Sequence, residues 1–97
     1  MEFVLSQPTI DITKIKQGDV EKEALRLAII AELDAISLYE QLASMVKKDD
    51  IRKVLLDVAK EEKTHVGEFQ ALLLKYDLEQ REELEHGKEE VEELTEK

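Results

Sequence analysis

The chain has 97 residues, of which 39% are charged and 4% aromatic, with one proline, three glycines and no cysteine. This composition is typical of one small helical domain, and the lack of cysteine excludes disulfides, thiolate zinc sites and iron–sulfur clusters. The net charge of −10 argues against nucleic acid and anionic membranes as partners and favours cations or basic proteins.

The N-terminal segment, residues 1–18, has no sustained helical period and contains Pro8 and Gly18, so we expect an extended arm there. Its apolar run at positions 3–5 is too short for a signal peptide and follows Glu2 rather than a basic segment. No long apolar run occurs elsewhere. We therefore expect a soluble protein of cytoplasmic type.

A first amphipathic helix is predicted to follow this arm, with Asp19 as its N-cap. Its apolar residues alternate four and three positions apart, which is the spacing of a single stripe along a helix. One position of the stripe carries a carboxylate instead of an aliphatic side chain. The stripe consists of Leu25, Ile29, Glu32, Ile36, Tyr39, Ala43 and Val46.

A second helix with the same spacing is predicted after a short polar break, residues 47–50, where two lysines end one helix and two aspartates begin the next. Residues 19–76 are therefore expected to form an antiparallel helical hairpin. Two successive stripe positions of the second helix are ionisable. The stripe consists of Ile51, Leu55, Val58, Glu62, His65, Phe69, Leu72 and Tyr76.

The C-terminal segment, residues 77–97, is predicted to be a short acidic helix that starts at a capping signal in Asp77–Gln80 and is broken or bent at Gly87. It holds ten acidic and three basic residues, and its apolar stripe is thin. We interpret its charge as a solvated face. The stripe consists of Leu84, Val91 and Leu94.

The misplaced ionisable residues, Glu32, Glu62 and His65, are candidate metal ligands. An i, i+3 spacing places Glu62 and His65 on one side of the second helix. Glu32 lies 16 residues before Lys48, and the pair lies 12 and 15 residues after Asp50, so in a hairpin all three fall within about 6 Å along the axis. A buried carboxylate without a cation costs several kcal/mol, which favours a bound metal.

A second Glu-x-x-His pair, Glu83 and His86, serves as a comparison within the chain. Its helical neighbours are glutamates, so we expect it to face water and to hold no metal. The alternative for the first pair is that Glu32 and Glu62 are paired with Lys or Arg, and that His65 is a core histidine. No Lys or Arg occupies the stripe positions of either predicted helix, so the compensating cation is missing.

Three ligands fill only part of a metal site, and a short chain gains from covering more apolar surface by self-association. Two copies of the hairpin supply the di-metal pattern of a four-helix bundle, a Glu from each of two helices and a Glu-x-x-His from each of two others. Their four carboxylates balance two divalent cations. Carboxylate and imidazole ligands suit Fe or Mn. Tyr39 is expected either to be a core tyrosine or to hydrogen-bond a ligand carboxylate.

Two segments, AIIAELDAISLYEQ over residues 28–41 and DVAKEEKTHVGEF over residues 57–69, make the chain resemble the encapsulated ferritins, which are housed in encapsulin nanocompartments. The resemblance implies an all-α subunit that dimerises into a ferritin-like four-helix bundle, with dimers joined into a ring. It also implies a di-iron ferroxidase site with two ions per dimer, with Glu32, Glu62 and His65 as iron ligands and Tyr39 nearby.

The same resemblance implies dioxygen as oxidant, an encapsulin shell protein as partner, and a location inside such a compartment. Some members have an acidic residue used in iron entry just before the first ligand. This chain has Ala31 at that position and Asp34 nearby as a candidate for the role. Two other functions stay open: a rubrerythrin-like di-iron or di-manganese peroxide reductase, and a non-catalytic helical cargo or interaction module whose polar residues fix the register.

Overall fold

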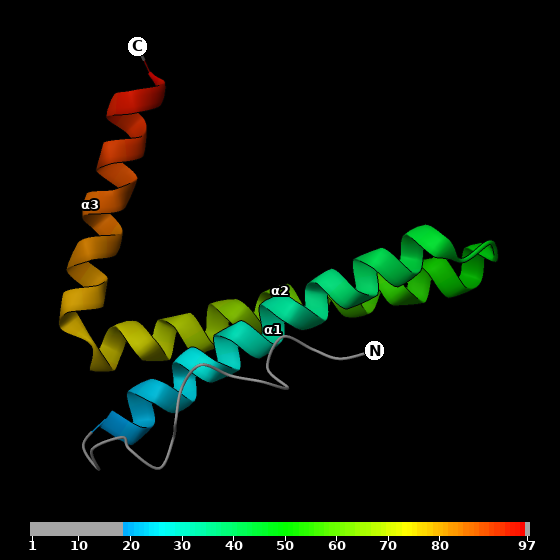
Figure 1. Ribbon diagram of the computed structural model, residues 1–97, viewed down its shortest axis with the longest axis horizontal. Coiled ribbons are helices and arrows are strands. Elements are labelled where there is room, and N and C mark those ends of the chain that lie inside the picture. Colours follow the sequence, from blue (N-terminus) through cyan, green and yellow to red (C-terminus); the bar gives the residue numbers. More distant parts are fainter. Residues whose placement is uncertain (1–18, 97) are drawn as a thin grey trace.

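The computed structural model describes residues 19–96, and the predicted N-terminal arm lies outside them. The described part is all-α, as expected, with three helices in the order α1 (Val20–Met45), α2 (Asp49–Tyr76) and α3 (Leu78–Thr95). Helices α1 and α2 run antiparallel side by side, and α3 leaves their far end at a steep angle (Figure 1). No helix in this range is long and apolar enough to cross a membrane.

The hairpin turn, residues 46–48, is closed by an arginine rather than by the lysines that the sequence suggested. Arg52 donates hydrogen bonds to the carbonyls of Ala43 at 3.2 Å and Val46 at 2.7 Å, which lie at the C-terminal end of α1. Since the last carbonyls of a helix have no intrahelical partner, the guanidinium satisfies both at once. Lys47 and Lys48 lie in the turn, beyond the last residue of α1.

Very little of the hairpin is fully buried. The buried hydrophobic residues are two alanines and one leucine, Ala43, Ala59 and Leu73, and no large side chain among the described residues is completely enclosed. Small residues at the contact let the two helices approach closely, but they bury little apolar area. The hairpin therefore keeps much of its apolar surface available to a partner.

Asp77 is the single residue that joins α2 to α3, and its backbone is not helical (φ −128°, ψ 89°). Its carboxylate accepts a hydrogen bond from the Gln80 N–H at 3.1 Å, which confirms the predicted capping signal. It also accepts from Arg26 of α1 at 3.0 Å. The same side chain thus caps the N-terminus of α3 and links the junction between α2 and α3 to α1.

Helix α3 runs unbroken through Gly87, so the predicted break there was wrong. A glycine inside a helix costs about 1 kcal/mol relative to alanine but adopts helical dihedrals without strain. The Asp77 cap, the eight glutamates and the three leucines of α3 favour the helix and outweigh that cost. No residue of α3 is buried.

We expect low pH to weaken the contacts that the Asp77 carboxylate makes at the junction between α2 and α3. The Gln80 N–H holds the pKa of Asp77 below its ordinary range, burial opposes the shift, and Lys22 and Arg26 add to the lowering. Because the folded pKa is depressed, this stabilisation is present above the ordinary value of about 3.9 and is lost as the pH falls through the folded pKa.

Asp77→Asn removes the charge and keeps an oxygen for the cap. In an acid titration followed by far-UV circular dichroism, the wild type should lose a helical contribution below about pH 4 that the variant lacks. Superimposable curves would contradict the role of the carboxylate charge.

Candidate metal centre

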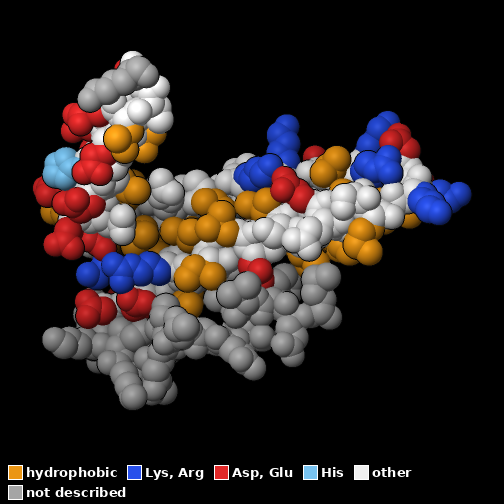
Figure 2. All heavy atoms as spheres, turned by 45° about the horizontal axis from the view of Figure 1, so that its top comes forward, with side chains coloured by type: hydrophobic (Ala, Val, Ile, Leu, Met, Phe, Trp, Pro, Cys, Tyr) orange, Lys and Arg blue, Asp and Glu red, His pale blue; other side chains and the backbone are white. Residues whose placement is uncertain are grey.

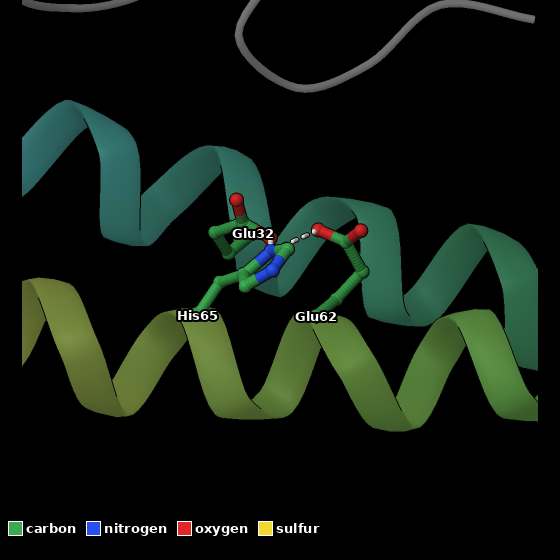
Figure 3. A group of neighbouring side chains, drawn as sticks. All are labelled: Glu32, Glu62 and His65. Carbon is green, nitrogen blue, oxygen red and sulfur yellow. Dashed lines mark ion pairs between the residues drawn. The ribbon is translucent and has the colours of Figure 1, made fainter.

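The three candidate ligands converge between α1 and α2. Glu32 lies midway along α1, and Glu62 and His65 lie one turn apart on α2. Their side chains point toward one another across the two helices (Figure 3). The residue counts on either side of the turn predicted that these three side chains lie at similar positions along the hairpin axis, and the structure agrees with that prediction.

The imidazole lies between the two carboxylates. The Nδ1 atom of His65 is 3.4 Å from Oε2 of Glu32 and 3.6 Å from Oε2 of Glu62. One ligand atom from each residue can be chosen so that all lie within 4.8 Å of one another. This is the only such group of three or more His, Cys, Asp or Glu residues within residues 19–96. Two carboxylates and one imidazole can bind a cation of the Fe or Mn type.

One oxygen of this cluster lacks the hydrogen bond that a buried carboxylate needs. Glu32 Oε2 is fully buried and has no hydrogen-bond partner, since His65 Nδ1 is close but does not meet hydrogen-bond geometry. A buried acceptor without a partner costs about 1–3 kcal/mol. The residues present therefore fit a metal ion, which would be a partner for this oxygen.

The cluster lies at the edge of the hairpin rather than in its centre. The side chains of Glu32 and Glu62 are 17% and 20% exposed, whereas that of His65 is 43% exposed. The expectation of core positions was thus only partly correct for a single chain, because its fully buried hydrophobic residues are Ala43, Ala59 and Leu73, whereas the ligands keep part of their surface exposed.

No Lys or Arg pairs with the ligands within the described range. Lys63, next to Glu62 in sequence, instead bridges to Glu40 of α1 at 2.9 Å. Sequence reasoning missed this bridge between helices because neither residue belongs to an apolar stripe. The alternative in which a lysine or arginine compensates Glu32 and Glu62 is therefore not supported by the ion pairs of the structure.

Two further candidates, Tyr39 and Asp34, lie outside the cluster. Tyr39 is partly buried two turns beyond Glu32, and no hydrogen bond joins its hydroxyl to the ligands within the described residues. Asp34 is two positions from Glu32, a spacing that places the two side chains on different faces of α1. Their roles stay predictions.

The comparison pair, Glu83 and His86, faces water as expected. Its side chains are 63% and 62% exposed, with His86 Nδ1 3.4 Å from Glu83 Oε2. No third ligand joins them in the described part of the chain. The same four-residue motif therefore forms a three-ligand cluster only where α1 adds Glu32.

Known proteins resemble the chain in sequence and in structure. The model of the family described as Rubrerythrin matches residues 23–96. The crystal structure of the encapsulated ferritin domain from Pyrococcus furiosus covers 100% of this chain and 97% of its own, with 52% identity and a TM-score of 0.80. The chain belongs to the encapsulated ferritins of the rubrerythrin family.

Two curated relatives of this encapsulated ferritin are linked to encapsulins by name. The ferritin-like–encapsulin shell fusion protein of Pyrococcus furiosus is 67% identical over 73 residues, which are 75% of this chain and 21% of that protein. The encapsulin nanocompartment cargo protein EncC of Myxococcus xanthus is 35% identical over 88 residues, 90% of this chain and 65% of that protein. The encapsulated ferritin thus spans about a fifth of the first relative and about two thirds of the second.

Proposed function

We propose that this chain is a ferroxidase, which oxidises Fe(II) to Fe(III) with dioxygen at a di-iron site formed between two copies. The observation that carries the proposal is the cluster of Glu32, Glu62 and His65, with its buried and unpartnered carboxylate oxygen. Membership of the rubrerythrin family supports iron over other divalent ions. The cluster by itself is compatible with Mn as well.

The first argument for two copies is the number of ligands. Each chain offers three ligand residues, and the described part of the chain contains no second set. A di-metal centre of a helical bundle uses a Glu from each of two helices and a Glu-x-x-His from each of two others. Two copies supply this set, and their four carboxylates neutralise two divalent cations.

The second argument is the apolar surface around His65, which we name the ligand face of α2. Its residues are three, four or seven positions apart, which is one or two helical turns, and so share one side of the helix. Four large apolar side chains on this face are 45–63% exposed in the single chain. A second copy that covers them also brings its ligands to the half-exposed His65. The ligand face consists of Ile51, Val54, Val58, His65, Leu72 and Tyr76.

The ligands have separate tasks in this proposal. Glu32 and Glu62 would hold iron through carboxylate oxygens and balance its charge, and His65 would bind through Nδ1, the nitrogen that faces both carboxylates. Fe(II) is the substrate: each ion gives up one electron, and dioxygen takes up the electrons together with protons. Metal ligands bind in their deprotonated forms, so we expect iron binding to weaken in acid.

The shell is proposed as the place where the iron is stored. Both curated relatives carry encapsulin in their names, one as a shell fusion and one as a cargo protein. We propose by this likeness that the chain works inside an encapsulin nanocompartment and associates with its shell protein. Dimers of this chain would then oxidise iron that accumulates as mineral in the compartment rather than within the dimer.

The family match also favours a second candidate, a rubrerythrin-like peroxide reductase, and the two functions differ in their oxidant. We expect the iron-supplied protein to oxidise added Fe(II) with dioxygen over many turnovers. Peroxide with a reductant should be consumed slowly by comparison. Stopped-flow absorbance of Fe(III), with peroxide followed in a parallel assay, measures both. Rapid peroxide consumption without turnover of Fe(II) would favour the reductase.

A further inference from the structure

Small side chains make up much of the contact between α1 and α2. Its buried hydrophobic residues are Ala43, Ala59 and Leu73, and no large side chain among the described residues is completely enclosed. Helices that pack through ridges and grooves of side chains hold each other at a fixed rotation, but alanines form only shallow ridges. Bonds between polar side chains of the two helices are therefore needed to fix the direction in which the metal ligands point.

An ion pair joins α1 to α2 beside the metal centre. The ammonium of Lys63 on α2 donates a hydrogen bond to Oε2 of Glu40 on α1 at 2.9 Å. Lys63 directly follows the candidate ligand Glu62 in sequence. Two arginines link the ends of the hairpin, one at its turn and one at its junction with α3. Lys63 is thus closer along its helix to a ligand than either arginine.

The ligand Glu62 and its neighbour Lys63 lie on opposite flanks of the contact with α1. Ala59 marks the side of α2 that faces α1, because it is 1% exposed. Glu62 follows Ala59 by three residues and Lys63 follows it by four. Since one turn takes about 3.6 residues, Glu62 falls about 60° short of the direction of Ala59, and Lys63 falls about 40° beyond it.

The partners of these two residues are separated in the same way on α1. Ala43, which is 3% exposed, marks the side of α1 that faces α2. Glu32 precedes Ala43 by eleven residues and Glu40 precedes it by three. These spacings place Glu32 about 20° to one side of Ala43 and Glu40 about 60° to the other. The metal cluster therefore lies on one flank of the α1–α2 contact, and the ion pair lies on the other.

The ion pair is specific to its two residues. Figure 2 shows both basic and acidic side chains along the hairpin, whereas the charged side chains of α3 are mostly acidic. Lys60, about one turn before Lys63 and also exposed, forms no ion pair with any residue of the range 19–96. The side chains of Lys63 and Glu40 are 58% and 46% exposed. An exposed pair of this kind adds little to folding stability, so its effect on the site is the more informative one.

We propose that Lys63 is a positioning residue, which through its ion pair with Glu40 keeps Glu62 and His65 turned toward Glu32. A rotation of α2 that moves the ligands on one flank must also move Lys63 on the other, and the ion pair opposes that movement. Lys63 acts through its helix and is not itself a ligand. The role rests on the proposed function, because it concerns the same metal centre.

Titration of the metal-free, full-length protein with Co(II) tests this role without relying on activity. Co(II) takes nitrogen and oxygen ligands as Fe(II) does, and its visible absorption reports the geometry of those ligands. Lys63→Met removes the charge and keeps a long side chain. We expect its Co(II) dissociation constant to rise about two- to fivefold, the range that an exposed ion pair can supply, and the absorption spectrum of bound Co(II) to change. Lys60→Met, the matched control, should leave both unchanged.

Exchanging the two charges provides a second test. Lys63→Glu places two carboxylates opposite each other and should weaken Co(II) binding further, whereas its combination with Glu40→Lys should restore most of the affinity. Far-UV circular dichroism at the titration temperature checks that each variant is folded. A double variant as weak as Lys63→Glu, or equal weakening in Lys60→Met, would overturn the positioning role.

The titration also separates this role from the proposed function. An unmodified chain that binds no Co(II) would overturn the metal centre and the positioning role together. An unmodified chain that binds Co(II), with the same dissociation constant and spectrum in Lys63→Met, would overturn the positioning role alone.

Discussion

Replacing either ligand glutamate should abolish iron oxidation. With Glu32→Ala or Glu62→Ala, we expect the initial rate of Fe(II) oxidation to fall more than about 100-fold, since changing residues that merely orient ligands already costs about 10–100-fold. In the proposed dimer, both copies of the carboxylate are lost. Two of the four negative charges that balance the metal ions are then absent, so iron binding should fail as well. Anaerobic Fe(II) titration and stopped-flow oxidation measure the two effects.

The chain contains its own control for this experiment. Glu83→Ala and His86→Ala alter the same motif in a setting where both side chains are more than 60% exposed. We expect the iron oxidation rates of these variants to equal that of the unmodified chain. Equal losses at both motifs would show that the site had been assigned to the wrong Glu-x-x-His pair.

The stability of the metal-free protein offers a check that does not depend on activity. Glu32 Oε2 is buried without a hydrogen bond, so Glu32→Ala removes a group whose burial costs about 1–3 kcal/mol. We expect the metal-free variant to melt at the same or a higher temperature than the metal-free original. With iron present the order should reverse, because only the original is stabilised by binding. A lower melting temperature without metal would indicate that Glu32 has a structural role.

A charge on the ligand face should separate the two halves of the site. In Val54→Asp and Leu72→Asp the replaced side chains are 63% and 45% exposed in the single chain, so the hairpin should still fold. In a dimer the new carboxylate would be buried without a partner, and such burial is strongly unfavourable. We expect dissociation into monomers, loss of the paired metal ions and loss of Fe(II) oxidation.

Native mass spectrometry with iron supplied measures both consequences together. The original chain should show two ions per dimer, and the variants should show monomers without a metal pair. Thr64→Asp is the matched control, because Thr64 is exposed and adjacent to His65 in sequence but about 100° away around the helix. A monomer of Val54→Asp that still oxidises iron at the original rate would contradict a site shared between two copies.

The sequence alone determined the helical hairpin and the identity of the candidate ligands. The alternating spacing of apolar residues fixes which side of each helix is apolar, and the residue counts on either side of the turn fix the height of each position. Glu32, Glu62 and His65 could therefore be assigned to one level. The N-terminal cap of α3 was also predictable from the sequence, because Asp77 stands three residues before Gln80, whose N–H it accepts in the structure.

Only the tertiary structure revealed how exposed the ligands are and which distant residues form bonds, because the spacing of apolar residues carries no information on either. The stripe gives the side of the helix but not the angle at which the next helix covers it, so the edge position of the cluster and the 43% exposure of His65 appeared only in the structure. Bonds between distant residues were also invisible, among them Arg26 to Asp77 and Lys63 to Glu40. Helix α3 continues through Gly87 because the favourable residues around the glycine outweigh its low helix propensity, and a single residue type does not reveal that sum.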